Sequence, residues 1–272
     1  MMVLRSAISF RNRISFFVLF LLFVAAGNAS TLYASSTPWP LQYLSGVAPD
    51  IKNTKLAQKT RELGFDNYVV MHSGVTMSPL WSAEYLTREN LLSAKGLERR
   101  NSFHHEEQLP VSERAELKDY AKSGLDRGHM APNADMPTEK AQWQCFSLAN
   151  MIPQDPDNNR NLWAAIESSV RTMVRNRGDL YVISGPLYLG NTLKRLNGRV
   201  FVPTNMFKIV YDPRLKRGAA YVVSNEPGEE WQVLSISQIE KLAGINFFPK
   251  LSFADKQSML KLPDPTRHND RY

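Results

Sequence analysis

The sequence predicts an α+β fold, and three observations support this class. Segments rich in β-branched and aromatic residues are mixed with amphipathic helical segments, without strict βαβ repetition. The 272 residues are 43% hydrophobic and 10% aromatic, which is enough for one substantial core and fits one domain better than two. The single cysteine, Cys145, cannot form an internal disulfide and has apolar neighbours, so we expect it to be buried in a core that needs no disulfides.

Residues 1–29 have the layout of a secretory signal peptide. Three arginines precede the apolar run Ile14–Ala26, and small residues follow it. The run is short for a membrane span, so we expect cleavage after Ala26 or Ala29; the alternative is an uncleaved N-terminal anchor. In either case we expect the rest of the chain to be exported, to the periplasm or the medium, without stable membrane association after cleavage.

The net charge favours an anionic partner. Removal of the leader with its three arginines lowers the formal net charge from +7 to +4. A modest positive excess of this size suits nucleic acid or another anion, although it does not require one.

Three segments follow the signal peptide. Residues 30–47 are rich in Ser, Thr and Pro and predict a linker or arm. Residues 48–262 contain the periodic segments and predict the folded domain. Residues 263–272 have proline and charges without a period and predict a frayed tail.

The first half of the folded domain begins with a predicted hairpin. Lys52–Glu62 is polar and predicts a short helix or a loop. Asn67–His72 has strand composition, a turn follows, and Leu80–Thr87 alternates as a returning strand. Ala115–Lys122 predicts a loop or short helix.

A long helix is the clearest element of the second half. Leu148–Ile152 predicts a short strand, and a loop follows in which Asp157 or Asn158 caps the helix. The helix runs to about Arg177, where Gly178 ends it. Five of its residues share one face at helical spacing and predict the side that contacts the core: Leu162, Ile166, Ser169, Val170 and Met173.

Further strands and one more helix complete the domain. Gly185-Pro186 predicts a turn that ends the first of these strands. Ser237–Glu240 has capping-box spacing and predicts the start of a helix that Gly244 ends. The strands are predicted at Leu180–Ser184, Val200–Pro203, Asn205–Tyr211 and Ala219–Ser224.

The stretch Leu125–Asp135 contains the most suggestive chemistry. In it Asp126, Arg127, Gly128 and His129 place an acid, a cation, a flexible residue and a titratable base in four consecutive positions. A lone histidine is more often structural than catalytic, so this cluster alone does not predict catalysis.

A polar stripe on the long helix adds a second cluster. Asn159, Trp163, Glu167 and Arg171 recur every four residues, and each step drifts by only about 40° around the helix. The ordinary interpretation is a helix cap at Asn159 and a Glu167–Arg171 ion pair worth about 0.3 kcal/mol. The alternative is that the amide oxygen of Asn159 is a neutral, hard ligand for hydrated Mg²⁺.

Several motifs in order resemble the DNA/RNA non-specific endonuclease family of ββα-metal nucleases. They are Asp126–His129, Asn150 with Pro153-Gln154, and Asn159-x-x-x-Trp163-x-x-x-Glu167. The resemblance extends roughly from Phe65 to Pro249. It implies a ββα-metal nuclease fold with a central, mostly antiparallel sheet flanked by helices.

The resemblance also implies catalytic roles. His129 would be the general base, because neutral imidazole is available near neutral pH. Asn159 would be the one direct protein ligand of a hydrated Mg²⁺, with Mn²⁺ as a substitute, and Glu167 would hold the metal's waters. Arg100 would provide positive charge to the phosphate.

Four more residues are expected to support these groups. Asn150 and Arg171 would orient or support them, and Asp126 and Arg127 would build the turn that aims His129. Family members often have Asp-Pro shortly after the phosphate-facing arginine, and this chain does not. Arg99 is therefore an alternative to Arg100. The neighbouring pair His104-His105 is expected to lie in a solvated loop and not to bind metal.

The sequence thus predicts an exported endonuclease that hydrolyses DNA and RNA without sugar specificity and leaves 5′-phosphate ends. Its expected partners are DNA and RNA, with a homodimer and an immunity or inhibitor protein left open. Two alternatives remain: a nucleic-acid-binding module on a degenerate nuclease fold, and a nuclease toxin with an immunity partner.

Overall fold

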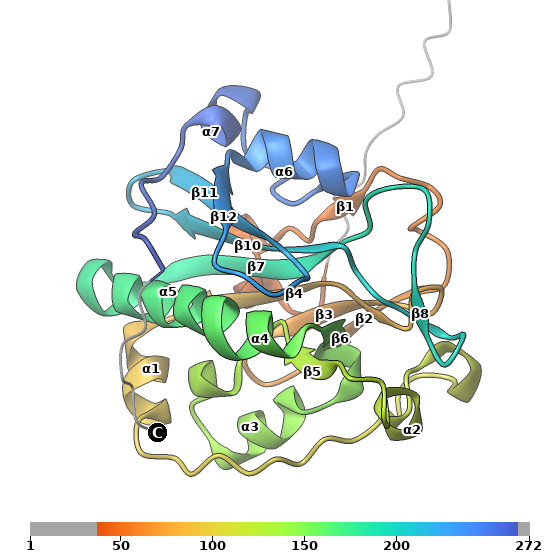
Figure 1. The fold of residues 1–272 in the computed structure, drawn as a ribbon. Coiled ribbons are helices and arrows are strands. Elements are labelled where there is room, and N and C mark those ends of the chain that lie inside the picture. The colour runs from red at the N-terminus through yellow and green to blue at the C-terminus, as the bar shows by residue number, and fades with distance from the viewer. Residues whose placement is uncertain (1–36, 266–272) are drawn as a thin grey trace, which may run out of the picture. The chain divides into compact units, whose positions relative to one another are not determined.

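A seven-stranded, fully antiparallel sheet forms the centre of the computed structural model, which describes residues 37–265 (Figure 1). The strand order is β12-β11-β10-β7-β4-β3-β2. Its strands are β2 (Thr60–Gly64), β3 (Val69–Ser73), β4 (Ser78–Leu86), β7 (Leu180–Leu187), β10 (Asn205–Asp212), β11 (Arg217–Ser224) and β12 (Trp231–Leu234). The predicted α+β class and the antiparallel sheet flanked by helices are confirmed.

Three short antiparallel pairs lie outside this sheet. They are β1 (Asp50–Ile51) with β13 (Ile245–Asn246), β5 (Asp126–His129) with β6 (Met151–Gln154), and β8 (Arg195–Leu196) with β9 (Val200–Phe201). The helices are α1 (Arg88–Ala94), α2 (Leu117–Tyr120), α3 (Glu139–Cys145), α4 (Pro156–Asn158), α5 (Ala164–Arg177), α6 (Ile236–Ala243) and α7 (Phe253–Gln257). Short 3₁₀ turns occur at Pro40–Gln42, Leu44–Gly46, Val111–Glu113, Asn133–Asp135 and Leu148–Asn150.

The central sheet separates two hydrophobic cores. Figure 1 shows α5 on one face of the sheet and α6 on the other. Because side chains alternate along a strand, β10 contributes to both cores. Val210 packs in the cluster that contains Val170 of α5, and Ile209 packs in the cluster that contains Ile236 of α6. Cys145 is buried as predicted.

The long helix forms with the predicted core face but begins earlier than predicted. Asp155, rather than Asp157 or Asn158, is the N-cap, and its carboxylate accepts a hydrogen bond from the Asn158 amide at 3.0 Å. Pro156 occupies the first helical position, where a backbone N–H has no partner within the helix. The proline is therefore tolerated there, and the helix begins before Asp157. α4 then continues through a π-helical turn, Asn159–Trp163, into α5, which ends at Gly178 as predicted. All five predicted core residues are buried.

Two further boundaries differ from the prediction. β7 continues through Gly185 to Leu187, so Gly185-Pro186 does not end the strand. The pairing of β4 with β7 stops at Ser184, so at Pro186 the only neighbouring strand is β10. A proline is tolerated there because β7 is locally an edge strand and needs no N–H on its free side. The capping box of α6 is formed by Ser235 and Gln238, not at Ser237.

Strand boundaries near the two hairpins also shift. The predicted hairpin of β3 and β4 is confirmed. Lys52–Glu62 was predicted to be a short helix or a loop, but strand β2 begins within it, at Thr60. Leu148–Ile152 divides into a 3₁₀ turn and strand β6, which extends to Gln154.

The N-terminal segment predicted as a linker or arm packs against the sheet where the structure describes it. Tyr43 is buried, and its hydroxyl donates to Glu62 at 2.8 Å. The Trp39 ring lies so close to Gly64 that a Cβ at Gly64 would come within 1.6 Å of it. Residues from Trp39 onward therefore belong to the folded unit. The predicted signal peptide and most of the predicted tail lie outside the described residues.

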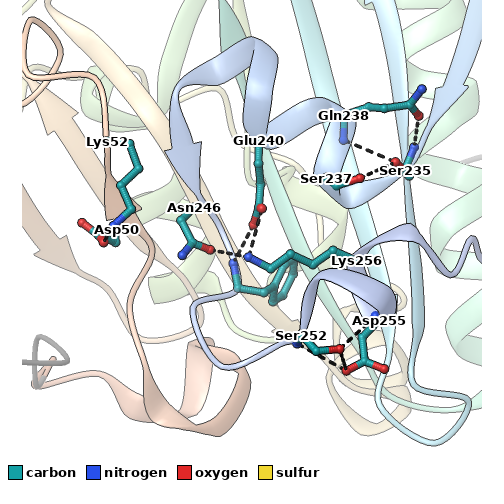
Figure 2. A network of polar contacts seen from close by, with 11 residues as sticks. Asp50, Lys52, Ser235, Ser237, Gln238, Glu240, Asn246, Ser252, Asp255 and Lys256 are labelled. Atoms are coloured by element: carbon teal, nitrogen blue, oxygen red, sulfur yellow. Dashed lines mark hydrogen bonds and ion pairs between the residues drawn. The ribbon is translucent and has the colours of Figure 1, made fainter. Parts of the chain in front are cut away.

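A polar network joins the C-terminal elements (Figure 2). The ammonium of Lys256 on α7 donates to Glu240 on α6 at 3.0 Å and to Asn246 on β13 at 2.6 Å. Glu240 also accepts from the Phe248 amide, so one carboxylate ties together three segments. Within residues 37–265 no helix has both the length and the apolar character to cross a membrane.

Candidate active site

A cleft of about 950 Å³ lies beside the hairpin β5–β6 and the helix α4–α5. It gathers most of the predicted site residues. From those predictions it is lined by Arg99, Asp126, Arg127, His129, Asn159, Glu167 and Arg171. Arg100 and Asn150 do not line it.

The hairpin β5–β6 places His129 in the wall of this cleft. In its register Gly128 faces Ile152 and His129 faces Met151. A Cβ at Gly128 would lie 1.9 Å from the side-chain oxygen of Gln154, so only glycine allows this close approach.

The imidazole of His129 is buried among aromatic rings. The Phe146 ring lies edge-on at 4.8 Å between centroids, and Phe103 lies at 5.7 Å. Burial, together with the smaller effect of the charges of Arg99 and Arg127, lowers the pKa of His129 to about 3. His129 is therefore neutral at physiological pH, and its Nε2 has no hydrogen-bond partner among the described residues.

The amide of Asn159 is oriented by Asp126. Asn159 Nδ2 donates to Asp126 at 2.9 Å, and Arg160 donates to both oxygens of the same carboxylate at 2.9 and 2.7 Å. Burial raises the pKa of Asp126, but the hydrogen bonds from Arg160 and Asn159 outweigh this and leave the pKa below its ordinary value. An ionised carboxylate only accepts hydrogen bonds, so Nδ2 must face Asp126 and Oδ1 must face away from it.

The donors in the cleft fit a hydrated Mg²⁺. Asn159 Oδ1 is a neutral oxygen left available by the contact with Asp126, and Glu167 adds a carboxylate to the same cleft. Hard oxygen ligands of this kind, few in number, suit Mg²⁺ that keeps most of its waters. Burial raises the pKa of Glu167 to about 6, against the lowering effect of Lys208 and Arg171, so Glu167 is mostly ionised at neutral pH.

The supporting residues act at the edges of the cleft. Arg171 donates to Asp135 at 3.2 Å, and both side chains are buried. Arg127 stacks on Phe103 with its guanidinium carbon 4.1 Å from the ring centroid. Asn150 is fully buried and bonds both the N–H and the C=O of Ala131, two residues after His129.

The structure places Arg99, not Arg100, in the cleft. The Arg99 guanidinium lies 5.5 Å from the centroid of the Phe146 ring that also packs on His129. The Arg100 side chain is 70% exposed, and its nearest acid is Glu98 at 3.9 Å. The structure therefore places the alternative, Arg99, in the cleft and Arg100 outside it, and the assignment of the phosphate-facing arginine to Arg99 is a prediction.

Other residues of the cleft were not predicted. Arg160, Lys122 and Asn101 line it. Arg160 follows Asn159 directly, so its place beside a proposed metal ligand was a signal available in the sequence; Lys122 and Asn101 gave none. His104 and His105 do not line the cleft: His104 stacks on Trp143 at 4.1 Å, and His105 lies 3.3 Å from Glu116.

The site combines a hairpin that carries a buried neutral histidine with a helix that carries an amide and a carboxylate, and all three groups line a basic cleft. This arrangement is typical of a nuclease of the ββα-metal class. The chain belongs to the DNA/RNA non-specific endonuclease family, whose model matches residues 49–254. It is therefore a nuclease that hydrolyses DNA and RNA.

Similar proteins agree with this assignment. The chain is 33% identical over 206 residues to Nuclease C1 of Cunninghamella echinulata var. echinulata, covering 68% of this chain and 82% of that protein. It is 30% identical to the mitochondrial nuclease of Saccharomyces cerevisiae, covering 72% of this chain and 68% of that protein. A chain in the crystal structure of the EndoG/EndoGI complex superimposes with a TM-score of 0.63 at 26% identity, covering 70% of this chain and 86% of that chain.

Proposed function

We propose that this chain is an exported, Mg²⁺-dependent endonuclease that cleaves DNA and RNA without sugar specificity and leaves 5′-phosphate and 3′-hydroxyl ends. One observation carries the proposal: neutral His129 lines the same cleft as Asn159 and Glu167. This combination provides a base and hard oxygen donors at one place.

His129 acts as the general base. Its neutral ring takes a proton from water as the water oxygen forms a bond to phosphorus and the bond from phosphorus to the 3′ oxygen breaks. The leaving 3′ oxygen then takes a proton from solvent. Burial lowers the pKa of His129 to about 3, so the ring is unprotonated at neutral pH and can accept a proton there.

Asn159 and Glu167 are the residues that would hold Mg²⁺, with Mn²⁺ as a substitute. Asn159 Oδ1 would bind directly, and Glu167 would hold the metal's waters. When bound, the ion supplies positive charge near the phosphate and the leaving oxygen. Asp126 and Arg160 keep the Asn159 amide in the orientation that this binding requires.

The arginines of the cleft provide charge for the phosphate. Arg99 takes the role expected of Arg100, and Arg171 and Arg127 support it. Contacts with phosphate carry no sequence information, and none of these groups requires or excludes a 2′-hydroxyl. This supports activity on both DNA and RNA.

Export is supported by the leader of residues 1–29, with a basic start, an apolar run and small residues. Some relatives are mitochondrial, so the location is tested directly. Mature N-terminal sequencing after expression in a bacterial host should give a start at Gly27 or Ser30 in the periplasm or medium; an uncut chain that stays with membranes would contradict export.

The proposed partners are DNA and RNA. The similar structure holds EndoG in a complex described as EndoG inhibition, which supports a protein inhibitor as a further partner of this chain. Light scattering tests the homodimer that the sequence leaves open: the mass of two chains would support it, and the mass of one chain would exclude it.

Cleavage by purified residues 30–272 tests the activity. Supercoiled plasmid and a structured RNA should both be degraded with Mg²⁺, and EDTA should stop both reactions. The product ends should accept label from polynucleotide kinase only after phosphatase treatment, as 5′-phosphates do. A folded His129→Ala variant that cuts as fast as the wild type, or binding without turnover in Mg²⁺ and Mn²⁺, would reject the proposal in favour of a binding module.

A further inference from the structure

Three polar side chains lie in register across the centre of the sheet. Ser82 on β4 faces Ser184 on β7, and Ser184 faces Lys208 on β10. All three are buried. Lys208 lies between Met206 and Val210 on the strand face directed at α5, so this polar row points toward the active-site layer.

Lys208 is the most unusual member of this row. Its side chain is 1% exposed, and its ammonium donates to Ser184 Oγ at 2.5 Å and to the Met130 carbonyl at 3.3 Å. It also lies 5.1 Å from the centroid of the Trp163 ring. Burying an ammonium is costly, and an apolar side chain of similar length would fill this space without that cost. The charge therefore requires a role other than packing.

The contacts of Lys208 belong to a set that holds the backbone after His129. The Trp163 indole donates to the His129 carbonyl at 3.3 Å. Lys208 holds the next carbonyl, that of Met130. Asn150 bonds the N–H and the C=O of Ala131, and Ser82 donates to the Asn150 amide oxygen at 2.8 Å.

We propose that Lys208 is a positioning residue for phosphodiester hydrolysis: it fixes the peptide that follows His129 and thereby the direction of the imidazole. The inference rests on the proposed role of His129 as the base. Lys208 does not line the cleft, so it does not touch the substrate; it contacts the Met130 carbonyl and its charge also lowers the pKa of Glu167, and the His129 resonance is the measurement that separates the two effects. Each carbonyl in the sequence His129-Met130-Ala131 has its own buried side-chain donor, so loss of one donor frees one peptide.

Glu84 offers a matched control in the same buried layer. It lies two residues from Ser82 on β4, and neither of its carboxylate oxygens has a partner among the described residues. Burial and the nearby Asp135 raise the pKa of Glu84 well above its ordinary value, against the lowering effect of Lys208. Glu84→Gln replaces a buried carboxyl group with an amide of similar size and leaves the contact between Lys208 and the Met130 carbonyl in place.

The test compares Lys208→Met, Ser184→Ala and Glu84→Gln with wild type on a short oligonucleotide at saturating Mg²⁺. We expect Lys208→Met to lower kcat at least about tenfold with KM within about twofold, because substrate contacts remain. Ser184→Ala should lower kcat in the same direction by less, and Glu84→Gln should stay within about twofold of wild type. In the Mg²⁺-free protein, the imidazole resonance of His129 should shift or broaden in Lys208→Met and not in Glu84→Gln.

Three results would overturn the inference. One is folded Lys208→Met with wild-type kcat; another is a rise in KM with unchanged kcat, which would place Lys208 on the substrate. The third applies if Lys208→Met does not fold: it is a Ser184→Ala variant whose kcat and His129 resonance both equal those of the wild type. If the wild type itself cleaves nothing, the proposed function fails, and the His129 resonance alone then decides whether Lys208 positions the ring.

Discussion

Arg99 and Arg100 are neighbours in sequence but lie in different surroundings, so alanine substitutions at the two positions separate the phosphate-facing arginine from its exposed neighbour. Arg99 lines the cleft and lies close enough to His129 to lower its pKa. Loss of one charged donor that acts on the transition state costs about 10²–10³ in kcat, or about 2.7–4 kcal/mol. We expect Arg99→Ala to show this loss in kcat. Arg100→Ala removes only an exposed pair with Glu98, worth at most about 1 kcal/mol of stability, and should leave kcat unchanged.

Initial rates on one fluorescent oligonucleotide, at saturating Mg²⁺ and several substrate concentrations, give kcat and KM for both variants. Thermal unfolding of each variant verifies that both fold. Arg99→Lys serves as a control for charge alone, because lysine keeps the charge but loses the planar fork. If Arg100→Ala is the slow variant and Arg99→Ala is not, the arginine that faces the phosphate is not the one in the cleft, and the assignment of this role to Arg99 fails.

Three further predictions follow from the electrostatics of the fold. Because the pKa of Glu167 is about 6 and a carboxylate must be ionised to hold the metal, Mg²⁺ affinity measured by calorimetry should fall by about tenfold for each pH unit below 6 and level off above pH 7; a Glu167→Gln variant with the same pH dependence would contradict this. Asp126→Asn replaces a carboxylate that only accepts hydrogen bonds with an amide that can also donate, so the orientation of Asn159 is no longer fixed; Mg²⁺ binding should weaken by about 10–100-fold in the same measurement, whereas an unchanged affinity would show that the amide needs no such partner. Lys256→Met leaves the half-buried Glu240 carboxylate without its cation and should lower the free energy of unfolding by about 1.5–3 kcal/mol in urea denaturation, and the double variant with Glu240→Gln should recover part of this loss; equal stability of the single variant and the wild type would refute it.

The sequence predicted the periodic parts of the fold well. The core face of α5 followed from apolar residues such as Ile166 and Val170 at helical spacing, and Gly178 marked the end of the helix correctly. Its start was misplaced because a proline at the first helical position, Pro156, was interpreted as part of a loop. The end of β7 was misplaced for a tertiary reason: Pro186 has no β4 partner to lose, and sequence alone does not show where a neighbouring strand stops.

The site was predictable where residues form an ordered motif. The motif predicted His129, Asn159 and Glu167 as site residues, and the structure brings them to one cleft. The choice between Arg99 and Arg100 depended on which side chain meets Phe146, a contact across 47 positions of the chain that no local pattern encodes. The contact between Lys208 and the Met130 carbonyl also joins distant parts of the chain, 78 positions apart, so no local pattern predicts it either.

The π-helical turn at Asn159–Trp163 has a consequence for changes in chain length. In a regular helix, eight steps of about 100° would leave Asn159 about 80° around the axis from Glu167. The wide turn absorbs about one residue, which reduces this offset to about 20° and aligns the two side chains on the cleft. Deleting one residue inside the turn would let it close as an ordinary α-helix without moving the buried face of α5. Such a shortened chain would have seven regular steps between the two side chains and therefore the same offset of about 20°, so the π-helical turn lengthens this helix by one residue without changing the relative direction of Asn159 and Glu167.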